Sequence, residues 1–307
     1  MNRAASEHDR DCTGEEHVSV LLGPVLELLR PGPGMRVVDG TVGRGGHAER
    51  LVEAIGVHGA LLAVDRDPEA LDRARARLKD ADARVLFEQA SFCQIPQLLD
   101  AHELGTADRV LLDLGLSSAQ LGRPERGFSF SEEGPLDMRF DPGSGGPTAA
   151  ALLARLSEPE LADLLHRYGQ ERFSRRIAKR VVRARGKKPI ETTGELADIV
   201  RRAVPGRSRI DKATRTFQAL RIAVNDELGE LERALTVLPD RLAAGGRFAV
   251  ISFHSLEDRL VKRAFRALPD EFREVTRKPV GPSAEEKRAN PRSRSAKLRV
   301  IERIGKE

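Results

Sequence analysis

The feature that most constrains this chain is a glycine-rich loop that follows a short apolar run ending at Asp39. The four glycines of the loop are Gly40, Gly43, Gly45 and Gly46. Residues 48–55 then have the apolar spacing of a helix. A strand, a glycine loop and a helix in this order bring main-chain N–H groups close to a nucleotide-like ligand. Glycine is needed there because a Cβ would bar positive φ values and close approach.

A second apolar run ends in an acid at Asp65, twenty residues past Gly45. A carboxylate at such a position typically accepts hydrogen bonds from ribose hydroxyls. The pattern therefore favours a ligand-binding unit, although a turn without any ligand is the alternative.

Alternating strand and helix patterns predict a parallel, doubly wound sheet. The strands are expected at 37–38, 61–64, 85–87, 110–114 and, after a turn at Gly245-Gly246, at 247–253. Ligands bind such sheets at the carboxyl ends of the strands, where Asp39, Asp65, Phe92 and Asp113 fall. Asp67 is expected to cap a helix that begins at Pro68. Residues 272–277 and 298–302 are expected to form a terminal antiparallel pair around a mobile loop at 281–295.

The alternation stops after the fourth strand. Residues 115–147 are rich in Gly, Pro and Ser and hold no credible strand, which indicates a functional loop or the start of an insert. Helical patterns follow to about 211, with Thr193 as a plausible cap, and a further helix at 214–238 is expected to return to the sheet. We predict a disordered tail at 1–14, an α/β domain at 15–118 and 214–307, and a mainly helical insert at 119–213.

Charge is distributed unevenly along the 307 residues. The net charge is +5, but residues 171–216 alone carry 15 Lys and Arg against 5 Asp and Glu. Such a concentration favours a polyanion-binding surface over a merely solvated helix face. Cys12 and Cys93 lack paired spacing, which indicates a reducing compartment, and the scattered histidines predict no metal site. No apolar run reaches membrane-spanning length and no signal-peptide core is present, so a soluble, cytoplasmic protein is expected.

Several longer motifs carry a resemblance to a known family. They are Asp39-Gly40-Thr41 with Gly43-Arg44-Gly45-Gly46-His47, Asp113-Leu114-Gly115-Leu116-Ser117-Ser118, Arg126-Gly127-Phe128-Ser129-Phe130, Gly134-Pro135-Leu136-Asp137-Met138-Arg139, and Ile251-Ser252-Phe253-His254-Ser255-Leu256-Glu257-Asp258-Arg259. Together they resemble the ribosomal RNA small-subunit methyltransferase H family, also called MraW, from about residue 17 to 302. The resemblance implies the Rossmann-like fold of the class I methyltransferases. It also implies methylation of the N4 amine of a decoding-centre cytosine in small-subunit (16S) ribosomal RNA, with S-adenosylmethionine as cofactor.

The resemblance further implies the cofactor contacts. Gly45, Gly46 and His47 would line the methionine end, Asp65 would bind the ribose, Phe92 would pack on the adenine, and Asp113 and Gln120 would complete the set. This agrees with physical chemistry, because an adenine favours an aromatic face, a diol favours a carboxylate and a sulfonium tolerates nearby acids. Taken alone, Phe92 is more often a core residue and His47 more often a helix-start residue.

Asp113 is our hypothesis for a catalytic contact shared by the cofactor and the cytosine amine. Other amino-methyltransferases use a polar residue and a carbonyl after the fourth strand, but the turn here lacks the prolines and aromatic residue of that pattern. Asp137 and His254 are weaker candidates, for which turn-forming and strand-capping roles fit at least as well.

The expected partner is the small ribosomal subunit with its 16S RNA. The arginines at helical spacing that would grip phosphates are Arg175, Arg176, Arg180 and Arg183. Two other functions remain open: a nicotinamide oxidoreductase, because Gly43, Gly45 and Ala48 also satisfy the dinucleotide fingerprint, and a non-catalytic ribosome-binding factor. The sequence leaves monomer and homodimer open, and does not identify the group that deprotonates the amine.

Overall fold

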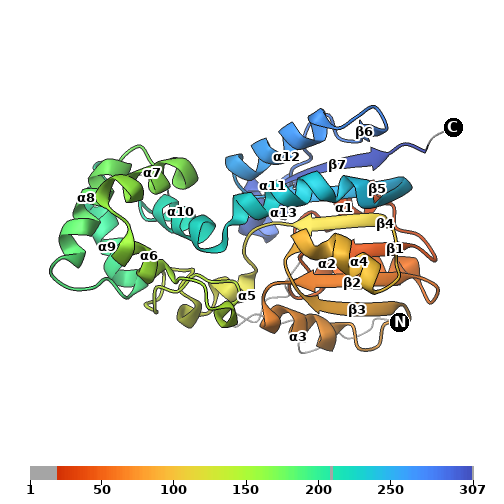
Figure 1. The fold of residues 1–307 in the computed structure, drawn as a ribbon, viewed down its shortest axis with the longest axis horizontal. Coiled ribbons are helices and arrows are strands. Elements are labelled where there is room, and N and C mark those ends of the chain that lie inside the picture. The colour runs from red at the N-terminus through yellow and green to blue at the C-terminus, as the bar shows by residue number, and fades with distance from the viewer. Residues whose placement is uncertain (1–18, 208–209, 306–307) are drawn as a thin grey trace. The chain divides into compact units, whose positions relative to one another are not determined.

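The computed structural model describes residues 19–207 and 210–305, arranged in two compact units. The described residues up to Gly115 and from Leu228 onward form the first unit, and Leu116–Glu227 form the second (Figure 1). The tail expected at 1–14 lies outside the described residues. Across the described ranges, no helix combines the length and apolar character that crossing a bilayer would require.

The first unit is built on a seven-stranded sheet with the order β3-β2-β1-β4-β5-β7-β6. The strands are β1 (Arg36–Asp39), β2 (Ala60–Asp65), β3 (Arg84–Gln89), β4 (Ala107–Asp113), β5 (Leu242–Ser252), β6 (Phe272–Glu274) and β7 (Lys297–Arg303). Strands β1 to β5 are parallel, whereas β7 runs antiparallel to both of its neighbours. The doubly wound sheet and its terminal antiparallel pair are thus confirmed.

Helices cover both faces of this sheet, which explains why its central strands are apolar without interruption. Val37, Leu61 and Leu111 face a core that also contains residues of α1 (Leu22–Leu29), α2 (Gly46–Ile55) and α3 (Pro68–Arg77). Val38 and Leu62 face the opposite core. That core is closed by α4 (Ile95–Ala101), α11 (Glu227–Val237) and α12 (Ser255–Ala267).

Asp67 caps α3 as predicted. Its side chain accepts a hydrogen bond from the Glu69 N–H, and Pro68 is the first helical residue. A capping oxygen and a proline that needs no N–H partner suffice to start this helix, so the local sequence specified it.

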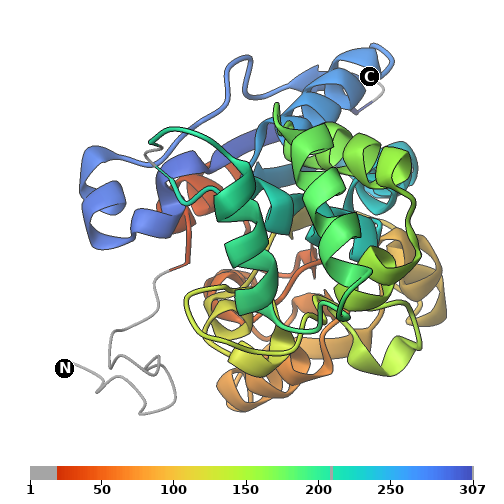
Figure 2. The same ribbon diagram turned by 90° about the vertical axis from the view of Figure 1, so that its left-hand side faces the viewer.

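Two expectations for the first unit are wrong. Residues 281–295 are not a featureless loop, since they contain α13 (Ala284–Ala289) and a 3₁₀ turn at Pro291–Ser295. The segment is fixed to α1, which lies beside it in Figure 2, because Glu286 Oε1 accepts a hydrogen bond from the Leu21 N–H at 2.7 Å. Gly245 and Gly246 lie inside β5 rather than before it, and Gly245 has a φ of +73° where the pairing with β4 shifts register.

The second unit is helical and has its own core. Its helices are α5 (Ser118–Leu121), α6 (Ala149–Arg155), α7 (Glu158–Gly169), α8 (Ser174–Arg185), α9 (Thr193–Ala203) and α10 (Thr214–Asn225). Buried apolar residues of α6 to α10, with Phe128, Leu136 and Met138 from the preceding segment, form this core.

Two further expectations are corrected in this unit. The helix expected at 214–238 is broken at Asp226, which has a left-handed φ of +50°, and α10 belongs to the second unit instead of returning to the sheet. The second boundary therefore lies after Glu227 rather than after residue 213. The cap of α9 is Thr192, whose side chain accepts the Glu195 N–H, whereas Thr193 is buried and donates to the Glu132 carbonyl.

Candidate functional site

Three acids end neighbouring strands at the carboxyl edge of the sheet. Asp39 ends β1, Asp65 ends β2 and Asp113 ends β4. Asp39 pairs with Ala63 of β2 and with Leu111 of β4. Each of these partners lies two residues before the acid that ends its strand. The strand pattern alone predicted this shared edge, and the pairing confirms it.

All three carboxyl groups have raised pKa values. Burial raises the pKa of Asp39 to about 7, and the negative charge of Asp65 adds to the effect. Burial also raises the pKa of Asp65 to about 6, although main-chain N–H groups of Asp67 and Gly43 oppose it. The pKa of Asp113 is raised well above its usual value by burial, and then by the charges of Asp39 and Glu257. A cation bound beside these carboxyl groups would favour their ionised form and lower their pKa values.

Asp113 is held from two sides. Its main-chain N–H donates to Thr41 Oγ1 at 2.6 Å, and its Oδ2 lies 3.6 Å from His47 Nδ1. Its other carboxyl oxygen, Oδ1, is buried and has no hydrogen-bond partner among the described residues. A buried polar atom left in this state marks a place where a ligand group can bind.

His47 presents one ring nitrogen to this acid. Its Nε2 lies 3.0 Å from the Val20 carbonyl oxygen, and because a carbonyl only accepts, Nε2 must carry a proton. If the imidazole is neutral, Nδ1 therefore faces Asp113 without a proton. When both ring nitrogens are protonated, His47 and the Asp113 carboxylate form an ion pair.

The glycine loop connects these acids to α2. Gly43 and Gly45 have φ values of +53° and +81°, which favour glycine, and no side chain caps α2. A Cβ on Gly46 would collide with Ser19 Oγ, and one on Gly45 would lie 3.4 Å from the Ala74 Cα of α3. At Gly46 the position of Ser19 thus limits the side chain, whereas at Gly45 the added contacts would be ordinary and the positive φ is what favours glycine.

Asp65 and Phe92 lie beside the same loop. Asp65 Oδ2 accepts the Gly43 N–H and its Oδ1 accepts the Asp67 N–H, both at 2.9 Å. A carboxylate can accept about four hydrogen bonds, so Asp65 can still accept one from a ribose hydroxyl. Phe92 begins a 3₁₀ turn, and a Cβ on Gly40 would lie 3.3 Å from its Cβ.

The last residue of the predicted cofactor set belongs to the second unit. Gln120 is buried, and its Oε1 accepts the Ser117 N–H at 3.0 Å. The structure thus brings the other six predicted cofactor residues to one edge of the first unit, and it describes Gln120 within the turn that begins the second.

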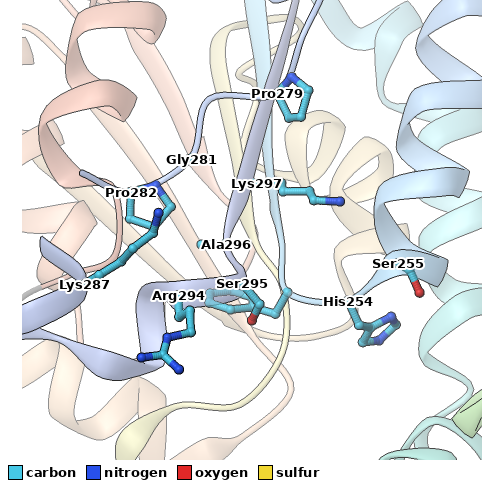
Figure 3. A pocket seen from close by; sticks show the side chains of 11 residues that line it. His254, Ser255, Pro279, Gly281, Pro282, Lys287, Arg294, Ser295, Ala296 and Lys297 are labelled. Carbon is cyan, nitrogen blue, oxygen red and sulfur yellow. The ribbon is translucent and has the colours of Figure 1, made fainter. Parts of the chain in front are cut away.

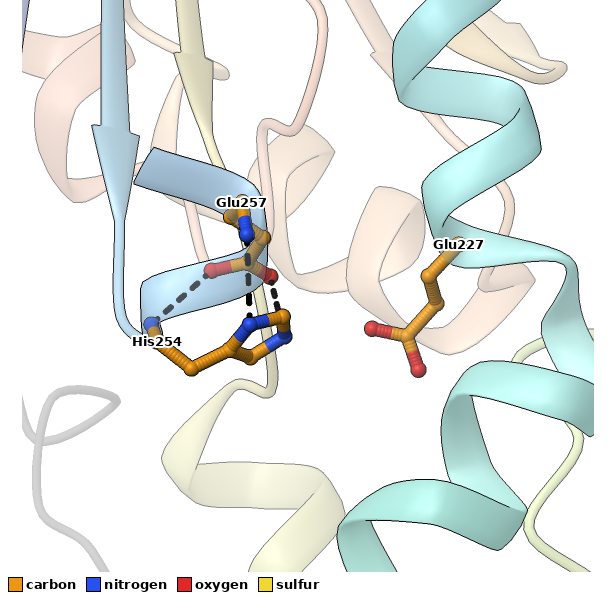
Figure 4. A group of neighbouring side chains, drawn as sticks. All are labelled: Glu227, His254 and Glu257. Atoms are coloured by element: carbon orange, nitrogen blue, oxygen red, sulfur yellow. Dashed lines mark hydrogen bonds and ion pairs between the residues drawn. The ribbon is translucent and has the colours of Figure 1, made fainter. Parts of the chain in front are cut away.

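His254 caps a helix and Asp137 forms a turn. His254 is the N-cap of α12, where its Nδ1 accepts the Glu257 N–H (Figure 4). Glu257 in return accepts the N–H groups of Phe253 and His254. Asp137 accepts the Arg139 N–H and binds the Arg139 guanidinium through both oxygens, as a turn-forming residue would.

The two motifs between residues 126 and 139 interlock within the second unit. Gly127 has a φ of +71°, and a Cβ there would collide with the Pro135 carbonyl oxygen. A Cβ on Gly134 would likewise collide with the Pro124 carbonyl oxygen. The buried Arg126 donates to the carbonyl groups at 139 and 140. These motifs therefore shape a long loop, and the described residues of 115–147 contain no strand, as expected.

Helix α8 carries the predicted RNA-contacting arginines on one face. The exposed side chains are those of Arg175, Arg176, Arg180 and Arg183, together with Lys179. The opposite face buries Ile177 and Val181 in the core of the second unit. Within the described part of the chain, no ion pair or hydrogen bond joins these four guanidinium groups to another residue.

Sequence reasoning missed two residues that act on Asp113. Thr41 accepts its N–H, and Glu257, only 2% exposed, raises its pKa. The capping-box spacing from residue 254 to Glu257 was a usable signal for a fixed acid at the end of β5. The contact from Thr41 depends on three-dimensional proximity and left no such signal.

The edge fits the chemistry of S-adenosylmethionine. That molecule carries positive charge on its sulfur and its amino group, and the edge offers acids whose pKa values are raised by desolvation. Asp65 is a carboxylate of the kind that accepts a hydrogen bond from a diol, and Phe92 provides an aromatic side chain on the adjoining turn. Asp113 offers Oδ1, which has no hydrogen-bond partner in the described part of the chain.

Comparison with known proteins agrees with this fit. The model of the MraW methylase family matches residues 14–304. The chain is 48% identical over 304 residues to "Ribosomal RNA small subunit methyltransferase H" of Gluconobacter oxydans, covering 93% of this chain and 92% of that protein. It is 50% identical to the proteins of the same name from Rhodopirellula baltica, over 94% and 92% of the two chains, and Thioalkalivibrio sulfidiphilus, over 94% and 97%. These matches decide against a nicotinamide oxidoreductase. The chain belongs to the MraW methylase family, and S-adenosylmethionine is its cofactor.

Proposed function

We propose that this methyltransferase transfers a methyl group to the N4 amine of a decoding-centre cytosine in 16S ribosomal RNA, in the cytoplasm. The names of the relatives support ribosomal RNA of the small subunit as the substrate. The observation that carries the proposal is the unpartnered Oδ1 of Asp113, buried at the end of β4 among acids that favour a cation.

When bound, S-adenosylmethionine supplies a methyl group that is already strongly electrophilic. The chain therefore mainly aligns and desolvates the reacting groups. In this proposal Asp65 binds the ribose hydroxyls and Phe92 packs on the adenine. Gly45, Gly46 and His47 line the methionine end, and Gln120 completes the set.

Asp113 has a second task towards the amine. A cytosine N4 amine is a weak nucleophile because its lone pair is shared with the ring. An acceptor that holds one of its hydrogens biases the lone pair outward, which is a preorganised electrostatic effect. Asp113 Oδ1 is such an acceptor once the carboxyl group is ionised, and a nearby cation favours ionisation.

The second unit serves as the RNA-recognition domain in this proposal. Its exposed arginines on α8 bind phosphates, and the target base enters the site from a single-stranded or flipped position. Binding of this kind weakens steeply with salt, because each neutralised phosphate releases counterions.

Methyl transfer from tritium-labelled cofactor tests the proposal. Small ribosomal subunits that lack the modification are incubated with the full chain, and the RNA is digested to nucleosides. We expect the label in N4-methylcytidine. Label in another nucleoside would overturn the assigned position, and RNA binding without any turnover would identify a non-catalytic ribosome-binding factor.

A further inference from the structure

A basic pocket lies in the first unit beyond the end of β5 (Figure 3). It has a volume of about 390 Å³. Its walls come from residues 253–255 after β5, from Pro279, Gly281 and Pro282, and from Lys287 together with residues 294–297. None of these residues belongs to the predicted cofactor set.

Two cations of the pocket are not neutralised. Lys287 and Arg294 lie on the same side of the pocket in Figure 3 and are exposed. Neither forms an ion pair with another residue in the described ranges. Lys297, by contrast, donates to Asp258 Oδ2 at 2.9 Å. The surrounding residues 277–297 hold 7 Lys and Arg against 2 Asp and Glu, so the local charge is strongly positive.

The pocket adjoins the edge where methyl transfer is proposed. Asp113 pairs in register with Ile251 of β5, and Ile251 pairs with Leu298 of β7, the residue after Lys297. Two strand spacings separate β4 from β7, which is about 10 Å. Phe253 forms a wall of the pocket, and a Cβ on Gly115, just after β4, would lie 3.4 Å from its ring.

The sign of the charge decides which ligand fits. The neighbouring edge is acidic and suits a cation, whereas this pocket is basic and suits an anion. Phe253, Pro279 and Pro282 add apolar surface next to the cations. Two neighbouring cations can bind the phosphate of a nucleotide, and the apolar surface beside them can contact its ribose or base.

We propose that this pocket binds a backbone phosphate of single-stranded RNA, at a nucleotide that flanks the methylated base. Lys287 and Arg294 hold the phosphate, and Phe253 contacts the adjoining sugar or base. The proposal rests on the proposed function, because it takes RNA as the substrate. It adds a contact surface in the first unit to the arginines of α8.

Charge reversal at Lys287 and Arg294 of the full chain tests the pocket. The variant Lys287→Glu/Arg294→Glu should bind a 16S RNA fragment about tenfold or more weakly, since each lost contact is a charge-assisted hydrogen bond. The slope of log affinity against log salt should become shallower by about 0.7 for one single-strand phosphate. Affinity for S-adenosylmethionine and kcat at saturating RNA should stay unchanged, while KM for RNA rises.

Matched variants separate the pocket from general surface charge. Arg288→Glu/Arg292→Glu makes the same change of charge at exposed residues of the same segment that do not line the pocket. It should weaken RNA binding much less, and an equal loss would overturn the proposal. Lys287→Ala/Arg294→Ala removes the cations without adding acids, and should show the same direction of change with an unaltered melting temperature.

Inorganic phosphate distinguishes the two sources of the anion. If phosphate binding is lost in the double variant while RNA affinity is retained, the pocket is a free-phosphate site and the RNA proposal is wrong. The binding measurement needs no methyl transfer, so it tests whether the pocket binds RNA even if the wild-type chain fails to methylate RNA. If the wild-type chain methylates RNA and the variants bind RNA normally, the pocket proposal is wrong and the proposed function stands.

Discussion

At the scale of single residues, Asp113 combines features that rarely occur together. Its Oδ2 lies 3.6 Å from His47 Nδ1, and its Oδ1 is buried and lacks a hydrogen-bond partner in the described residues. Its position after a strand was predictable from the sequence. Its electrostatic environment was not, because Asp39 of β1 and Glu257 of α12 are distant from it in the chain.

Replacing Asp113 with Asn tests its role towards the amine. The amide keeps the shape but loses the negative charge, so we expect kcat to fall by about 10²–10³, as for removal of one preorganised polar contact. Affinity for S-adenosylmethionine should change only a few-fold. Single-turnover methylation and calorimetric titration of the cofactor measure the two effects.

Asp137→Asn is a suitable control for that experiment. Its carboxylate binds Arg139 within a turn of the second unit, so we expect lower stability but nearly normal kcat. Near-normal methyl transfer by Asp113→Asn, with unchanged cofactor affinity, would refute the role of Asp113.

At the scale of elements, the helices of the second unit depend on close backbone approach. Gly169 ends α7, and a Cβ there would lie 2.5 Å from the Arg215 carbonyl oxygen of α10. We expect Gly169→Ala to lower the free energy of unfolding by about 1–3 kcal/mol, as overpacking does. Chemical denaturation followed by circular dichroism measures it.

Gly186→Ala provides the matched glycine. Gly186 follows α8 with a φ of −66°, and an added Cβ would make only ordinary contacts, the nearest at 3.5 Å. This change should be neutral or slightly stabilising. Equal destabilisation by the two changes would show that the close contact between α7 and α10 is not what requires Gly169.

The exposed face of α8 gives a second prediction at this scale. Reversing its four arginines to Glu should weaken RNA binding by at least about 10³-fold at moderate salt, because several phosphate contacts are lost. Cofactor affinity should not change. Filter binding at several salt concentrations and cofactor titration give the two values.

An equal number of reversals on α12 controls for net charge. The exposed cations there are Arg259, Lys262, Arg263 and Arg266. If this variant loses as much RNA affinity as the α8 variant, α8 has no special role. Loss of cofactor affinity in the α8 variant would also count against an RNA-contact role.

The elements show what the sequence could and could not specify. Strands buried on both faces and the cap at Asp67 follow from local patterns, and both were predicted. The break at Asp226 has a left-handed φ, which is uncommon for a non-glycine residue, and the apolar spacing did not predict it. The polar segment 281–295 became ordered through Glu286 and the Leu21 N–H, which are 265 residues apart.

At the scale of the whole molecule, the raised pKa values of the edge acids link stability to pH. An acid whose pKa is higher when folded contributes stability below its unfolded pKa and loses it as pH rises through the folded pKa. For Asp65, stability is lost between about pH 4 and about pH 6. For Asp39, it is lost between about pH 4 and about pH 7. The ligand-free first unit should therefore lose stability between pH 5 and 8 from these groups.

Cofactor binding should counteract this loss, because a cation binds the ionised acids more tightly. We expect the rise in melting temperature caused by S-adenosylmethionine to grow from pH 5 to pH 8. Asp39→Asn, which stays neutral, should flatten both the ligand-free slope and this growth. Differential scanning fluorimetry of the two proteins measures it, and identical pH profiles would show that Asp39 does not titrate in this range.

The pairing of β4 with β5 also has a consequence for synthesis. The two strands are neighbours in the sheet, yet the whole second unit is translated between them. While that unit emerges and folds around its own core, β4 is an edge strand with unpaired main-chain groups for a time on the order of ten seconds. Nascent chains stalled within this interval are therefore the species of this protein most prone to aggregate, and chaperone capture should peak there and end once β5 has left the ribosome.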